Sequence, residues 1–182
     1  MARKYLMPVL LIALALAPVK VCFARTQRQG PRNSIGAGVR YNDHVEMDEI
    51  ENAEFDDSYL SYVVGFRYEP NYMWIVDAVL DYYPSGDDIS YILSPRISLL
   101  RGHGFCYGMG IEWKYVKLES GESDWSDETY LVQAGFEMPM AGDNMLHIDA
   151  YYGLEEFSDS FEIISDFDSD RLTFGLRFYH YF

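Results

Sequence analysis

The feature that most constrains this chain is a regular alternation of apolar and polar residues. Between residues 105 and 115 every second residue is large and apolar, and Cys106, Gly108, Gly110, Glu112 and Lys114 stand between them. A period of two predicts β-strands that keep one apolar face. We find no helical spacing of useful length, so the sequence predicts an all-β fold. The alternation recurs in eight segments: 34–43, 58–69, 72–83, 89–101, 105–117, 129–139, 145–155 and 170–182.

The connections between these segments alternate in length. The short ones are 70–71, 102–104 and 140–144. The longer ones are 44–57, 84–88, 118–128 and 156–169. Short turns at one rim and long loops at the other are typical of outer-membrane-type β-barrels.

The polar face of the strands indicates which side is enclosed. In a soluble barrel or sandwich the apolar face would point inward, whereas in a membrane barrel it would point to lipid. The polar face carries cations and anions in similar number, as an enclosed lumen requires, because buried charges must be paired. We therefore predict an interior charge network of Arg40, Arg67, Asp77, Asp81, Arg96, Glu112, Lys114, Glu137, His147, Asp149, Arg171 and Arg177. Glycines on the same face would leave room for arginine and tyrosine side chains in a narrow barrel.

Aromatic residues gather at both ends of the apolar face, as they do at the two interfaces of a membrane barrel. We predict one girdle of Trp74, Phe105, Tyr107, Phe136 and Phe178 toward the short turns. A second girdle toward the long loops would contain Tyr82, Tyr91, Trp113, Tyr115, Tyr130 and Tyr152. The predicted fold is an eight-stranded antiparallel up-and-down transmembrane β-barrel. Pro95 lies within a strand and lacks an N–H, so we expect a bulge or a lost hydrogen bond there.

The first residues predict a cleaved signal peptide over 1–24, with basic Arg3 and Lys4, an apolar core, and a cut after Ala24. A lipoprotein anchored at Cys22 is the weaker alternative, because Val21 precedes it where a small residue is expected. We expect a periplasmic leader at 25–33 and the barrel at 34–182. Removing 1–24 takes the formal net charge from −15 to −18, and such acidity argues against nucleic-acid binding.

The last segment also resembles the C-terminal insertion signal of outer-membrane barrels. The residues that carry the resemblance are Thr173, Gly175, Phe178 and the aromatic Phe182, whereas His180 stands where that family favours an apolar residue. The chain is thus similar to the small eight-stranded outer-membrane β-barrel proteins. The resemblance implies the outer membrane of a Gram-negative bacterium, with extracellular loops and periplasmic termini. It also implies a monomer that contacts outer-membrane lipid and lipopolysaccharide and is inserted by the barrel-assembly machinery.

The predicted loops contain most of the acidic residues. One interpretation is a divalent-cation surface, with Ca²⁺ or Mg²⁺ bridging to lipopolysaccharide phosphates; the alternative is a solvated acidic rim. The candidate cation ligands are Glu46, Asp48, Glu49, Glu51, Asp124, Asp127, Asp166 and Asp168. No other cofactor is expected.

His147 and Asp149 share the predicted inner face and are the only pair that suggests hydrolytic chemistry. Some eight-stranded barrels deacylate lipid A with a His and a Ser two residues apart, but here the second residue is Asp. We therefore predict a structural or surface-interaction barrel that is not an enzyme. The alternatives left open are a lipid A-modifying hydrolase or acyltransferase and a soluble periplasmic ligand-binding barrel.

Overall fold

The computed structural model describes residues 30–42, 59–84, 89–154 and 172–182. Among them, no helix is long and apolar enough to cross a membrane. Several predicted features lie outside the described residues: the signal peptide, most of the leader, Arg171, and the loop carboxylates Glu46, Asp48, Glu49, Glu51, Asp166 and Asp168.

The described chain forms ten strands. They are β1 (Arg32–Asn42), β2 (Tyr59–Glu69), β3 (Trp74–Tyr83), β4 (Ile89–Arg101), β5 (Phe105–Glu112), β6 (Tyr115–Leu118), β7 (Ser123–Trp125), β8 (Thr129–Pro139), β9 (Asn144–Leu154) and β10 (Leu172–Tyr181). The bounds differ from the predicted ones by a few residues. The first strand starts at Arg32, inside the predicted leader, because Arg32 and Asn33 pair with Glu69 and Tyr68 of β2.

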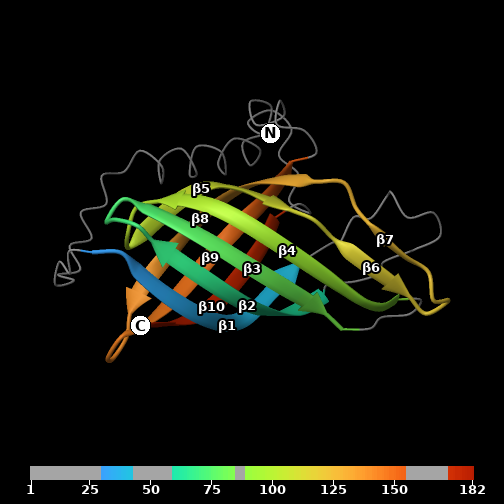
Figure 1. Ribbon diagram of the computed structural model, residues 1–182, viewed down its shortest axis with the longest axis horizontal. Helices are drawn as coiled ribbons and strands as arrows, with labels where there is room; N and C mark the ends of the chain where they lie inside the picture. The colour runs from blue at the N-terminus through green and yellow to red at the C-terminus, as the bar shows by residue number, and fades with distance from the viewer. Residues whose placement is uncertain (1–29, 43–58, 85–88, 155–171) are drawn as a thin grey trace, which may run out of the picture.

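The strands close into an eight-stranded antiparallel barrel, which confirms the predicted fold class (Figure 1). All pairings are antiparallel: β1 to β5 pair in sequence, β5 pairs with β8, β8 to β10 pair in sequence, and β1 pairs with β10 to complete the circle. Strands β5 and β6 both pair with β4 and form one interrupted barrel strand. β7 pairs with β6, so this hairpin extends beyond the barrel at the long-loop end (Figure 1). The segment 118–128, predicted as a loop, therefore contains a strand.

The interruption between β5 and β6 lies opposite Pro95, as its missing N–H predicts. Trp113 N donates to Pro95 O at 3.1 Å, but Pro95 cannot return the bond. The Ser94 hydroxyl donates to Trp113 O at 3.2 Å and replaces the lost partner. The prediction of a lost hydrogen bond is confirmed, and a side chain compensates for it.

The apolar face of the strands points outward. In β10, Phe174, Leu176 and Phe178 are exposed, whereas Gly175 and Arg177 between them are buried. The turns that connect β2 to β3, β4 to β5 and β8 to β9 lie at the end where β10 finishes (Figure 1). Phe182 N donates to Asn33 O at 3.0 Å, so the backbone pairing reaches the last residue.

The predicted aromatic girdles are largely present on the outer surface. At the short-turn end the ring of Phe105 lies 5.1 Å from that of Phe136, centre to centre. At the other end Tyr82, Tyr91 and Tyr115 follow one another at 6.3 Å. Tyr152 departs from the prediction because it is buried.

The interior is less uniformly polar than predicted, because apolar clusters occupy both of its ends. Tyr83, Ile89, Ile92 and Val116 form one cluster toward the long loops. Ile89 was predicted on the outer face, but the register shifts between Ile89 and Tyr91, and this bulge turns Ile89 toward the cluster. Toward the short turns lie two smaller clusters, Ile75–Leu100–Cys106 and Met145–Tyr179–Tyr181.

Candidate functional site

The centre of the barrel is a buried charge network, as predicted. Among the described residues, four arginines and six carboxylates are buried there. They are Arg40, Arg67, Arg96, Arg177, Glu69, Asp77, Asp81, Glu112, Glu137 and Asp149. Lys114 was predicted in the same set and is only half-buried.

The part of the network toward the long loops is built on Arg40. Its guanidinium bonds Asp81 of β3 and, at 2.6 Å, Glu112 of β5. Arg96 of β4 lies 3.8 Å from Asp81 and 3.9 Å from Glu112. Two cations therefore share two anions, and each charge faces an opposite one.

Arg177 of β10 organises the middle of the network. It donates to Asp77 of β3 at 2.7 Å and also to Asp149 of β9. The hydroxyls of Tyr151 and Tyr179 each lie 2.7 Å from its Nη atoms and also donate to Asp149 and Asp77 respectively. One guanidinium is thus enclosed by two carboxylates and two phenols.

Toward the short turns, Arg67 of β2 donates to Glu137 of β8 at 2.6 Å. The second carboxylate oxygen of Glu137 accepts from Gly104 N at 3.2 Å. Nearby, the Tyr181 hydroxyl donates to Glu69 at 2.5 Å. Glu137 therefore links the charge network to the turn between β4 and β5.

Tyrosines are the part of this network that our sequence analysis missed. Tyr151 lies under Arg96, 3.9 Å from guanidinium carbon to ring centre, and Tyr179 lies under Arg67 at 4.5 Å. Both face inward because they occupy the same alternate positions as Asp149 and Arg177. That parity was visible in the sequence, which predicted room for tyrosine rings inside the barrel but placed no particular tyrosine in the network.

Glycine makes room for one of these rings, as predicted. A Cβ on Gly36 would lie 2.6 Å from Tyr179 Cδ1 and 2.8 Å from Phe178 O. No side chain fits there without displacing the ring or the strand. The ring of Tyr179 can lie against β1 because Gly36 has no side chain.

The His147–Asp149 pair is brought together, with His147 Nε2 2.9 Å from Asp149 Oδ2. Both side chains are buried, and Asp149 is also held by Arg177 and Tyr151. The pair is therefore part of the interior network. Within the described residues, no serine accompanies His147 on the inner face of β9.

The remaining predicted site residues lie at the two ends of the barrel. Asp124 and Asp127 are exposed near the end of the β6–β7 hairpin. Thr173 and Gly175 face inward and Phe178 and Phe182 outward, while His180 Nδ1 lies 2.9 Å from Asn144 Oδ1. This places the residues of the C-terminal pattern on β10 and just after it, and the insertion role stays a prediction.

Comparisons with solved structures return barrels of low sequence identity. The crystal structure of the outer membrane protein OprG from Pseudomonas aeruginosa is 14% identical, covering 85% of this chain and 97% of that chain, with a TM-score of 0.48. Ail of Yersinia pestis is 16% identical over 85% of this chain and 99% of that chain, with a TM-score of 0.39. Neisserial surface protein A is 10% identical over 82% and 95%, with a TM-score of 0.40. The chain matches no family model and no curated protein.

The fold and the interior together define a class. A closed antiparallel barrel, apolar outside and filled with paired charges inside, has the architecture of the eight-stranded outer-membrane β-barrels. This assignment rests on the strand pairing and the burial pattern rather than on the distant similarities. It confirms the class that the sequence resembled.

Proposed function

We propose that the protein is an outer-membrane β-barrel of a Gram-negative bacterium, with a structural or surface-interaction role and no enzymatic activity. The observation that carries this proposal is the inversion of polarity. Large apolar side chains such as Tyr62, Ile97 and Phe174 are more than half exposed, at 57, 56 and 51%. Three arginines are almost completely buried at the same time. Water would not stabilise such an exterior, whereas lipid would.

The interior argues against a general porin. Ion pairs cross the lumen between strands that are not neighbours: β1 to β5 through Arg40 and Glu112, and β2 to β8 through Arg67 and Glu137. Eight strands enclose a space just wide enough for side chains. Purified barrel in planar bilayers should therefore give no steady ion conductance, and a stable open channel would contradict this part of the proposal.

The orientation follows from the ends of the barrel. The start of β1 and the end of β10 lie at the short-turn end, which we assign to the periplasm, and the long loops are then extracellular. We propose that the barrel is a monomer and that the assembly machinery reads the pattern around Phe178 and Phe182. Protease added to intact cells should cut within 43–58 or 155–171 and leave the short turns intact.

We also propose that the extracellular carboxylates bind Ca²⁺ or Mg²⁺ and bridge to lipopolysaccharide phosphates. Support comes from Asp124, which is exposed on the β6–β7 hairpin that extends beyond the barrel, and from Asp127, which is exposed two residues after that hairpin ends. Replacing both by Asn should weaken binding of Ca²⁺-loaded lipopolysaccharide vesicles. Equal binding of the variant and the wild type would leave a solvated acidic rim as the interpretation.

The first experiment is gel mobility of the membrane fraction, with and without heating. A heat-dependent shift in the membrane pellet is the expected result, because the closed barrel resists unheated detergent. Soluble protein without a shift would favour the periplasmic ligand-binding alternative, although that alternative requires the apolar face to point inward. The lipid A-modifying alternative is tested by mass spectrometry of lipid A with and without induced expression, and an unchanged spectrum is expected.

A further inference from the structure

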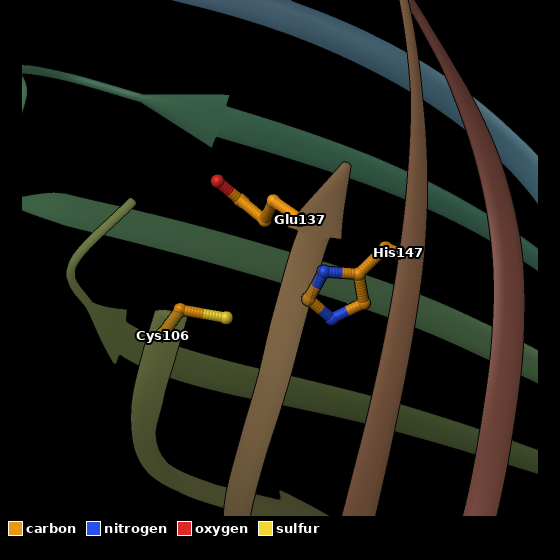
Figure 2. A group of neighbouring side chains, drawn as sticks. All are labelled: Cys106, Glu137 and His147. Carbon is orange, nitrogen blue, oxygen red and sulfur yellow. The ribbon is translucent and has the colours of Figure 1, made fainter. Parts of the chain in front are cut away.

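Three potential metal ligands converge inside the barrel near the short turns. Cys106, Glu137 and His147 come from β5, β8 and β9, and Figure 2 shows the three side chains projecting into the same space. A thiol sulfur, a carboxylate oxygen and an imidazole nitrogen all lie within 4.8 Å of one another, and all three residues are buried. The charge network described above uses Glu137 but not the thiol, whose hydrogen bond is a long one of 3.7 Å to Gly135 O, nor the second nitrogen of the imidazole.

The strand register produces this convergence. Glu137 lies directly opposite His147, and Cys106 lies opposite Gly135, two residues before Glu137 on the same face. A Cβ on Gly135 would lie 3.0 Å from His147 Cε1. The absence of a side chain at Gly135 therefore leaves the space in which the thiol and the imidazole face each other.

The imidazole is oriented as metal-binding histidines usually are. Its Nε2 lies 2.9 Å from Asp149 Oδ2, and this contact favours the proton on Nε2 and a lone pair on Nδ1. His147 is fully buried, and neither ring nitrogen makes a hydrogen bond of good geometry among the described residues, although Nε2 lies against the Asp149 carboxylate. A buried nitrogen without a partner is costly, and a bound metal ion would satisfy it.

The charge balance of the interior also favours a cation. Among the described buried groups, six carboxylates face four arginines. Glu137 already binds Arg67 through one oxygen and Gly104 N through the other. An ionised carboxylate has about four lone-pair sites, so Glu137 keeps the capacity to bind a metal ion as well.

We propose that Cys106, Glu137 and His147 bind one thiophilic divalent transition-metal ion, with Zn²⁺ as the best match to a sulfur, nitrogen and oxygen donor set. Binding converts the Cys106 thiol to the thiolate and releases its proton to solvent. Zinc bonds of about 2.0–2.3 Å place the ligand atoms of a tetrahedral site about 3.3–3.8 Å apart, so atoms that lie within 4.8 Å of one another need to move closer by no more than about 1.5 Å. His103, whose Nδ1 lies 3.4 Å from Glu137 Oε2 at the β4–β5 turn, groups with Glu69 and Glu137 instead of with the thiol and the imidazole, so the fourth position of the ion is left to water.

The test uses the full chain with Cys22→Ser, so that Cys106 is the only thiol, folded in detergent and stripped with a chelator. Co²⁺ is titrated in the presence of excess Mg²⁺, which occupies weak carboxylate sites. We expect one equivalent of Co²⁺ to give a thiolate charge-transfer absorption that Zn²⁺ then removes. Cys106→Ser and His147→Gln should abolish this absorption and weaken Zn²⁺ binding by more than about 100-fold.

His180→Gln is the matched control, because His180 is exposed against Asn144 on β10, which β8 and β9 separate from the β5 strand that carries the thiol. This variant should bind metal as the parent chain does. Heat-dependent gel mobility shows whether each variant is folded. Should the variants fail to fold, X-ray absorption of the zinc-loaded parent chain still decides, with a sulfur neighbour expected at about 2.3 Å. A spectrum with only oxygen and nitrogen neighbours, or unchanged binding in Cys106→Ser, would overturn the proposal.

Discussion

Arg177 is the residue whose removal tests the interior network most directly. In Arg177→Leu, Asp77 and Asp149 lose their shared cation. The hydroxyl oxygens of Tyr151 and Tyr179 also lose the guanidinium N–H groups that donate to them. Asp77 keeps the Tyr179 hydroxyl and Arg67, whose Nη2 lies 3.7 Å away. Asp149 keeps the Tyr151 hydroxyl.

Removing one partner of a buried ion pair costs about 3–5 kcal/mol, because the remaining charge stays desolvated. Arg177 serves two carboxylates, and each retains another donor, so we expect the free energy of unfolding to fall by about 3–5 kcal/mol. The interior already holds more buried carboxylates than arginines, which makes loss of a cation worse than loss of an anion. The assay is urea unfolding of the barrel in phospholipid vesicles, followed by tryptophan fluorescence and gel mobility.

Arg101→Leu is the matched control, because it is the same substitution on an exposed side chain. The guanidinium of Arg101 lies 5.9 Å from the Trp74 ring, and its loss should cost less than about 1 kcal/mol. In an Arg177→Leu background, Asp149→Asn should recover part of the stability, since the uncompensated charge is then gone. Equal stability of the Arg177 and Arg101 variants would refute the view that paired charges hold the interior together.

Two further predictions concern the backbone of the barrel. Gly36→Ala should lower the free energy of unfolding by about 1–3 kcal/mol, because the added methyl group meets the Tyr179 ring and the backbone of β10. Adding Tyr179→Leu should remove part of that loss, measured by the same urea titration. A Gly36→Ala barrel as stable as the parent would show that the Tyr179 ring does not lie against Gly36. Ser94→Ala should cost about 0.5–1.5 kcal/mol, because Trp113 O loses its donor. The cost should nearly vanish in a Pro95→Val background, where a backbone N–H is available, and a cost that is the same in both backgrounds would contradict the compensation.

The sequence was sufficient to predict the barrel because period two separates an apolar from a polar face, and the balanced charges on the polar face indicate an enclosed interior. Each strand places its odd and even residues on opposite faces. Assigning Phe178 to the lipid face therefore assigns Arg177 and the alternate residues of that strand to the interior. Pro95 was predictable for a similar reason, since the missing N–H acts locally. Its compensation by Ser94 was not, because a side chain bond depends on the rotamer that packing allows.

Two features of the barrel, the bulge in β4 and the interior tyrosines, could not be predicted from the alternation of apolar and polar residues. The bulge between Ile89 and Tyr91 shifts the register by one residue and reverses the face of Ile89, and nothing in the alternation of β4 marks where a bulge falls. Tyr151 and Tyr179 were visible by parity, but a phenol is compatible with either face. Only the pairing of its hydroxyl with Arg177 and a carboxylate shows why it is stable inside.

The convergence of Cys106, Glu137 and His147 shows the same limit at the level of function. Their spacing along the chain resembles no metal-binding motif, because the ligands lie on three different strands, β5, β8 and β9, with β6 and β7 between the first two. They meet only when β8 is placed between β5 and β9 in a register that sets Gly135 beside Cys106. Side chains fill the interior of an eight-stranded barrel, so a ligand fits only where a small residue leaves space. Chemistry inside it therefore depends on where a glycine faces inward, and Gly135 is the position at which a glycine adjoins both a buried thiol and an imidazole nitrogen that makes no hydrogen bond.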